Sequence, residues 1–285
     1  MHSNLRNLKW YIRCVMDNAS LRNFLDLKVK LYNVPAFIEW DPISIPHRFK
    51  KRQDIEIMGL IASLFAWGQR TTIINKSIEV AERMQQRPHD FVVSHQPKEL
   101  KQLLGFKHRT FNDTDLLAVV AFLHRWYKEN SSLETAFSYG MKAGDTTVEN
   151  ALNGFRELFF READMPNRTR KHIASPRQNS ACKRLNMYLR WMVRKDRQGV
   201  DFGLWKSIGM HQLVCPLDVH VQRVAIQLGL MLRNQADWKA AIELTENLKR
   251  MDPKDPVRYD FALFGMGINS ATESGKQLPR KLTDF

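Results

Sequence analysis

Two segments of the chain carry side chains whose types and spacing suit chemistry on a polyanion. The first is Lys183–Arg194, with the sequence KRLNMYLRWMVR. At about 100° per residue of an α-helix, its apolar side chains fall on one face. The opposite narrow face collects Lys183, Asn186, Arg190 and Arg194. Because this stripe contains no acid, we expect it to contact phosphate groups together with the neighbouring Arg184.

The second segment is PLDVHVQRVAIQLG, residues 216–229. Asp218 stands where the N-cap of a helix is expected, with an apolar stripe following it. His220 and Arg223 fall on the other face of this helix. An aspartate here can simply bind the free N–H groups of the first turn. It can also stabilise positive charge that develops on a substrate, and the spacing leaves both roles open.

The second segment also carries a family resemblance. PLDVHVQRV followed by QLGL is similar to the segment that holds the catalytic aspartate of helix-hairpin-helix DNA glycosylases, and Asp218 falls on that aspartate. LFAWGQRTT at residues 64–72 resembles the first bundle helix of that superfamily and the glutamine-bearing turn after it, which implies that Gln69 and Arg70 lie near DNA. FALFGMG at residues 261–267 resembles the closing helix of the same fold.

The chain departs from this superfamily at the glycine-rich hairpin, where SPRQNSACK stands at residues 175–183 without a glycine. In this it resembles an uncharacterised bacterial family of about the same length, distantly related to archaeal 8-oxoguanine DNA glycosylases, which also lack the usual hairpin. On that variant Lys183 takes the place of the catalytic lysine. The alternative for Lys183 is a phosphate contact without a covalent role.

The resemblance implies a base-excision repair glycosylase with AP-lyase activity, acting on a damaged base such as an oxidised purine. Lys183 would attack the sugar C1′ and form a Schiff base, while Asp218 stabilises the sugar cation and moves the amine proton. The target base must leave the stack, so stacking and polar side chains are expected around it. Weaker candidates for this base pocket are Trp67, Phe106 and His108. Two alternatives stay open: a non-catalytic nucleic-acid-binding protein, or an enzyme acting on RNA or nucleosides.

Apolar residues recur at helical spacing almost throughout, and β-type alternation is nearly absent apart from Phe91–Val93, so we predict an all-α fold. The resemblance makes it a two-lobed glycosylase-like fold with an atypical hairpin. One unit, 1–285, would divide into a bundle lobe, 50–196, and a second lobe, 1–49 plus 197–285. Asp54 and Thr71 or Thr72 are expected to cap the first two bundle helices. Further helices are expected over 114–129, 148–160, 180–195, 219–228, 237–251 and 259–266.

The composition favours a polyanionic partner, because 44 Lys and Arg against 30 Asp and Glu give a net charge of +14. Duplex DNA is the first candidate, and no membrane or protein partner is inferred. Neither an export signal nor a membrane span is found, which predicts a cytoplasmic protein. The three cysteines are too few for a four-cysteine zinc or iron–sulfur site, so we expect no metal and no cofactor.

Overall fold

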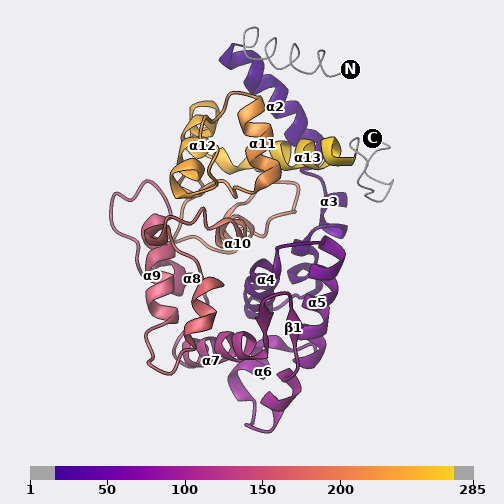
Figure 1. Ribbon diagram of the computed structural model, residues 1–285, viewed down its shortest axis with the longest axis vertical. Coiled ribbons are helices and arrows are strands. Elements are labelled where there is room, and N and C mark those ends of the chain that lie inside the picture. The colour runs from indigo at the N-terminus through magenta and orange to yellow at the C-terminus, as the bar shows by residue number, and fades with distance from the viewer. Residues whose placement is uncertain (1–16, 273–285) are drawn as a thin grey trace.

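The computed structural model describes residues 17–272, which form an assembly of helices (Figure 1). Helix accounts for 62% and strand for 2%, so the predicted all-α class is confirmed. The strands β1 (Lys107–His108) and β2 (Phe111–Asn112) form one short antiparallel hairpin. Phe91–Val93, the one segment with β-type character, lies instead within helix α6 (Pro88–Ser94), which begins at a proline that suits the first helical position.

The remaining elements follow in chain order. The first helices are α2 (Asn18–Tyr32), α3 (Ala36–Glu39), α4 (Arg52–Phe65), α5 (Arg70–Arg83), α7 (Asp113–Glu129), α8 (Glu134–Ser138) and α9 (Glu149–Phe159). The later ones are α10 (Lys183–Val193), α11 (Val219–Gln227), α12 (Trp238–Met251) and α13 (Tyr259–Thr272). Short 3-10 helices are η1 (Pro42–Ser44), η2 (Pro46–Arg48), η3 (Glu99–Leu103), η4 (Asn167–Lys171), η5 (Pro176–Gln178), η6 (Met210–Gln212) and η7 (Pro256–Arg258).

Every helix expected from periodicity is present, with shifted ends. Helix α10 begins at Lys183 rather than Ser180, because Asn179 and Cys182 both have left-handed backbone conformations that end helical geometry before it. Helices α2, α3, α6 and α8 were not expected. Most of them are short or weakly patterned, so periodicity gives little signal for them.

Two of the predicted caps are wrong. Helix α4 begins at Arg52, and the Asp54 carboxylate accepts a hydrogen bond from the backbone N–H of His89 on α6 at 2.8 Å. Helix α5 begins before Thr71, with Gln69 as an N-cap whose side chain makes no capping hydrogen bond. Which residue caps a helix depends on where the preceding turn ends, and tertiary contacts determine the course of that turn.

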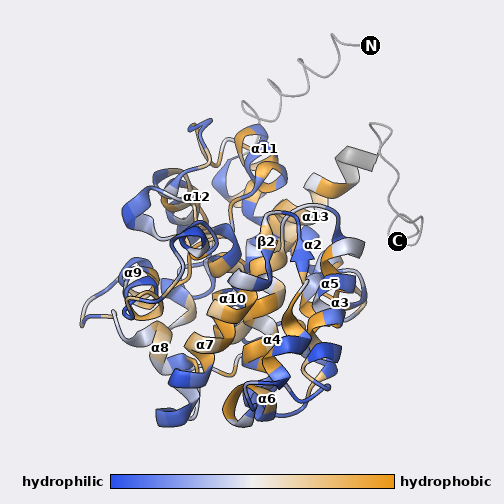
Figure 2. Cartoon of the chain, turned by 60° about the horizontal axis from the view of Figure 1, so that its bottom comes forward, coloured by the Kyte–Doolittle hydropathy of each residue, from blue (hydrophilic) through white to orange (hydrophobic). Residues whose placement is uncertain are grey.

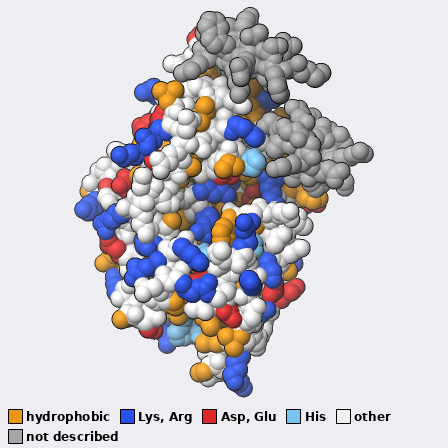
Figure 3. All heavy atoms as spheres, in the orientation of Figure 1, with side chains coloured by type: hydrophobic (Ala, Val, Ile, Leu, Met, Phe, Trp, Pro, Cys, Tyr) orange, Lys and Arg blue, Asp and Glu red, His pale blue; other side chains and the backbone are white. Residues whose placement is uncertain are grey.

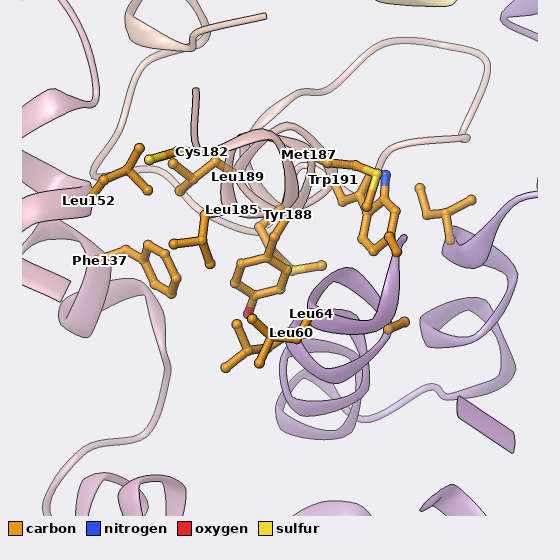
Figure 4. Packing of buried hydrophobic residues seen from close by; sticks show 14 of the residues in the cluster. Leu60, Leu64, Phe137, Leu152, Cys182, Leu185, Met187, Tyr188, Leu189 and Trp191 are labelled. Atoms are coloured by element: carbon orange, nitrogen blue, oxygen red, sulfur yellow. The ribbon is translucent and has the colours of Figure 1, made fainter. Parts of the chain in front are cut away.

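Part of the buried core lies where α10 packs on α4 (Figure 4). Tyr188 points from α10 toward Leu60 and Leu64 of α4 (Figure 4), and its hydroxyl donates to the backbone carbonyl of Glu56 at 2.9 Å. A Cβ on Gly59 would stand 3.1 Å from the Tyr188 ring, so glycine permits this close approach. Apolar residues are concentrated on α4, α7 and α10 (Figure 2). Close packing of these residues holds α10, and with it the first turn of that helix, in position.

A buried carboxylate ties the same region together. Glu56 is fully buried on α4 and accepts hydrogen bonds from the Tyr127 hydroxyl at 2.8 Å and the Trp205 indole at 2.8 Å. It also accepts from Ser132 and from the backbone N–H of Leu133. Because its donors come from segments far apart in the sequence, Glu56 fixes α4 against α7, the loop after α7 and the segment 200–205 that follows α10.

The polar stripe of α10 is the main correction to the sequence analysis. Arg190 and Arg194 are 3% and 2% exposed. Arg194 pairs with Asp196, Asp201 and Asp255, and Arg190 pairs with Asp201 and Asp260.

Asn186, on the same stripe, is 1% exposed and donates to the Ala181 carbonyl at 3.0 Å. The prediction that Asn186, Arg190 and Arg194 form a solvent-facing, phosphate-binding stripe is therefore wrong. The acidic partners of Arg190 and Arg194 lie outside the helix, where its periodicity could not reveal them.

In Figure 1, α11, α12 and α13 lie with α2 at one end of the molecule and α4 to α9 lie at the other, with α10 between them. Helix α13 packs on both α2 and α11, while η1 and η2 pack on α4. The lobe boundaries predicted from the sequence stay a prediction, and residues 42–48, which they place in the second lobe, contact the bundle. Among residues 17–272, no helix has the length and apolar character to cross a membrane.

Candidate active site

The first turn of α10 and the start of α11 bring Lys183 and Asp218 together. The Lys183 Nζ lies 4.0 Å from Asp218 Oδ2, and the two side chains are 25% and 22% exposed. Asp218 Oδ1 accepts from the backbone N–H groups of His220 at 2.9 Å and Val221 at 3.0 Å, so the predicted cap is confirmed. One carboxylate oxygen therefore caps α11, and the other faces the amine.

Both side chains line a cavity of about 460 Å³, which falls within the size range of small-molecule sites. Its wall is built by the turn after α4, by α5, α10, α11 and α13, and by the segment from α3 to η1. The lining residues are Phe37, Asp41, Pro42, Ala66, Trp67, Gly68, Arg70, Ile73, Lys183, Arg184, Met187, Arg190, Pro216, Asp218, Val219, His220, Val221, Asp260 and Phe264. The cavity is therefore assembled from segments distributed over most of the described chain.

Trp67 forms an aromatic wall of this cavity, with guanidinium groups beside its ring. The guanidinium carbon of Arg184 lies 5.6 Å from the centre of the Trp67 ring and that of Arg109 lies 5.2 Å from it. Arg184 also donates to the Leu64 carbonyl at 2.7 Å, and burial lowers its pKa to about 10. Arg184 thus holds the C-terminal end of α4 and the turn that presents Trp67, in addition to lining the cavity.

Two buried acids line the cavity and were missed by the sequence analysis. Burial raises the pKa of Asp260 to about 6, although the paired guanidinium of Arg190 opposes this rise. Asp41 accepts from the backbone N–H of Ile43 at 3.0 Å and caps η1. The sequence contained a signal for Asp260, because it is the acid at the start of the apolar segment of α13. Its partner Arg190 is distant in the sequence, so local patterns did not reveal the pair.

The structure separates the remaining predicted residues into those at the cavity and those away from it. Trp67, Arg70 and His220 line it. Gln69 is exposed beside Arg70, and Arg223 is exposed on α11 and donates to the Gly267 carbonyl. Lys and Arg side chains gather on the middle of the face shown in Figure 3.

Phe106 and His108 are the predicted base-pocket residues that the cavity does not include. Phe106 is 1% exposed and stacks on Phe65 with ring centres 5.3 Å apart. The His108 Nε2 lies 3.0 Å from the Phe65 carbonyl oxygen, and burial lowers the pKa of His108. Both belong to an aromatic cluster around Phe65, so their assignment to the base pocket is wrong.

Comparison with known proteins identifies the family to which the chain is similar. The model of a family described as "Protein of unknown function (DUF2400)" matches residues 41–269. No curated protein matches, and no solved structure matches. The matched range contains Lys183, Asp218 and all the cavity-lining residues except Phe37.

Proposed function

The chain belongs to the DUF2400 family, and for this member we propose the activity of a DNA glycosylase and AP lyase that removes a damaged base, with oxidised purines as the first candidates. The observation that carries the proposal is the Lys183 amine 4.0 Å from the Asp218 carboxylate in a cavity of about 460 Å³. A nucleophilic amine beside a carboxylate that can accept a proton suits covalent cleavage of an N-glycosidic bond.

The fold is part of the proposal. Three segments that resemble helix-hairpin-helix glycosylases, residues 64–72, 216–229 and 261–267, each supply lining residues to the same cavity. These segments are far apart in the sequence but meet at one site, which supports a common origin of this site and the glycosylase site. We accordingly assign the two-lobed glycosylase-like fold, with the SPRQNSACK loop in place of the usual hairpin.

The reaction begins with Lys183 Nζ as a free amine. Its lone pair attacks the sugar C1′, the C1′–N bond breaks, and the bond's electron pair leaves with the base, which takes up a proton. Asp218 stabilises the positive charge on the sugar and accepts the proton that the nitrogen loses. Ring opening then gives a C1′=N Schiff base. Loss of a proton from C2′ expels the 3′ phosphate, which cleaves the strand.

The walls of the cavity suit an extruded base. Trp67, Phe37 and Phe264 offer aromatic surfaces, and Asp260, which pairs with Arg190, offers a hydrogen-bonding carboxyl group on the same wall. Extrusion costs a few kcal/mol, and the cost is least for a damaged or mismatched base. The net charge of +14 favours binding to the phosphate backbone, so duplex DNA is the proposed partner and the cytoplasm the proposed location.

The test is borohydride trapping on duplexes that hold an abasic site or 8-oxoguanine. We expect a covalent adduct with the wild type, none with Lys183→Ala, and a rate about 10²–10⁴-fold lower with Asp218→Ala. Lys171→Ala is the matched control, because Lys171 is exposed and lies outside the cavity lining, so this variant should retain the adduct.

Binding without an adduct on any duplex would contradict the proposed chemistry and indicate a non-catalytic nucleic-acid-binding protein. Release of bases only from RNA or from free nucleosides would indicate the other class of enzyme.

A further inference from the structure

The cations that line the cavity differ in whether they already have an acceptor. Lys183 faces Asp218, Arg184 donates to the Leu64 carbonyl, and Arg190 pairs with Asp201 and Asp260. Arg70 is the exception: within residues 17–272 its guanidinium has neither a hydrogen-bond acceptor nor a carboxylate at ion-pair distance.

The guanidinium of Arg70 is partly withdrawn from water. Its central carbon lies 4.8 Å from the centre of the Phe264 ring. Burial lowers the pKa of Arg70, and the attraction of Asp41 and Asp218 offsets only part of this effect. A cation that has lost hydration without gaining hydrogen bonds is costly, and most such groups in proteins have a partner.

The position of Arg70 indicates what that partner is. Arg70 lies in the first turn of α5, borders the same cavity as Lys183 and Asp218, and also borders a smaller cavity beside Tyr32 and Trp40. If the sugar of a nucleotide lies between Lys183 and Asp218, the phosphate attached to that sugar is the nearest anion of the substrate. Stacking on Phe264 holds one guanidinium face and leaves its N–H edge available for a forked contact.

We propose that Arg70 binds a phosphate flanking the nucleotide held by Lys183 and Asp218, so that the cavity selects phosphorylated nucleotide units over free nucleosides. This inference rests on the proposed function for the placement of the sugar, but not on glycosylase or lyase activity. A neutral nucleoside would leave the Arg70 guanidinium without an acceptor and would bind more weakly.

The experiment measures binding of the full chain to duplexes that hold a tetrahydrofuran abasic analogue, which cannot form a Schiff base. In separate duplexes, the phosphate on the 5′ or the 3′ side of the analogue is replaced by a neutral methylphosphonate. For the wild type, we expect one replacement to weaken binding on the order of tenfold or more. Arg70→Ala should bind the unmodified duplex that much more weakly and should lose the sensitivity to this replacement.

The matched control is Arg250→Ala, which removes an exposed arginine at the end of α12, outside the cavity lining. It should keep the sensitivity of the wild type. Arg70→Lys retains the charge without the fork and should fall between wild type and Arg70→Ala. Thermal unfolding without DNA shows whether each variant is folded.

The inference would be overturned if the methylphosphonates weakened duplex binding by Arg70→Ala as much as they weaken binding by the wild type. It would also be overturned by a wild type whose binding depends on neither phosphate. A second arm compares 2′-deoxyguanosine with its 3′ and 5′ monophosphates. Arg70-dependent preference for the monophosphates without duplex binding would support the phosphate contact while contradicting DNA as the substrate, which keeps the two proposals separable.

Discussion

Asp201 provides the sharpest test of how α10 is held. Its side chain is fully buried, and it bonds the Nε of Arg190 at 3.3 Å and the Nη1 of Arg194 at 3.0 Å. Asp201→Asn keeps the shape of the side chain and removes its charge. Both guanidiniums then lose a carboxylate in an environment where water cannot replace it.

Removal of one member of a buried ion pair costs about 3–5 kcal/mol. Arg194 keeps Asp196 and Asp255, and Arg190 keeps Asp260, so the remaining acids compensate in part. We therefore expect the free energy of unfolding to fall by about 3 kcal/mol, at the lower end of that range. Equilibrium urea denaturation at neutral pH, with the midpoint and slope fitted separately, measures this change.

The matched control is Asp90→Asn. Asp90 bonds Lys51 at 2.8 Å, but the two side chains are 52% and 44% exposed. This pair should contribute about 1 kcal/mol or less. If Asp201→Asn costs no more than Asp90→Asn, the buried network does not stabilise α10, and the reasoning that assigns Arg190 and Arg194 to structure is refuted.

Two further predictions concern the cavity wall and the packing of α9. Burial raises the pKa of Asp260 from 3.8 to about 6, so as the pH rises the folded state keeps the Asp260 proton up to a higher pH than the unfolded state does. The contribution of Asp260 to the free energy of unfolding should therefore fall by about 3 kcal/mol as the pH rises from about 4 to about 6. Urea unfolding of the wild type relative to Asp260→Asn should show this slope, and a difference independent of pH would contradict it. Gly154→Ala on α9 should cost about 1–3 kcal/mol in the same assay, because the new Cβ would lie 2.6 Å from the Cα of Gly140. A cost below about 0.5 kcal/mol would show that the two backbones separate easily.

The sequence predicted the elements well where the signal is local. Helices α7, α9, α11 and α12 were expected within a residue or two of their bounds, because periodic apolar positions report which residues share a helix face. Asp218 was identified as a cap from its place before an apolar helix, and its hydrogen bonds to His220 and Val221 confirm it. The polar stripe of α10 misled, because periodicity shows that residues share a face but not what that face meets.

By itself the sequence determined that the chain is helical, that Asp218 caps α11, and that Lys and Arg exceed the acids. Only the tertiary structure decided which of these charges are neutralised inside the protein. It paired Arg190 and Arg194 with acids outside their helix and left Lys183 with Asp218 at a cavity. The physical reason is that helix formation and capping depend on neighbours within a few residues, whereas burial and charge pairing depend on which distant segments pack together.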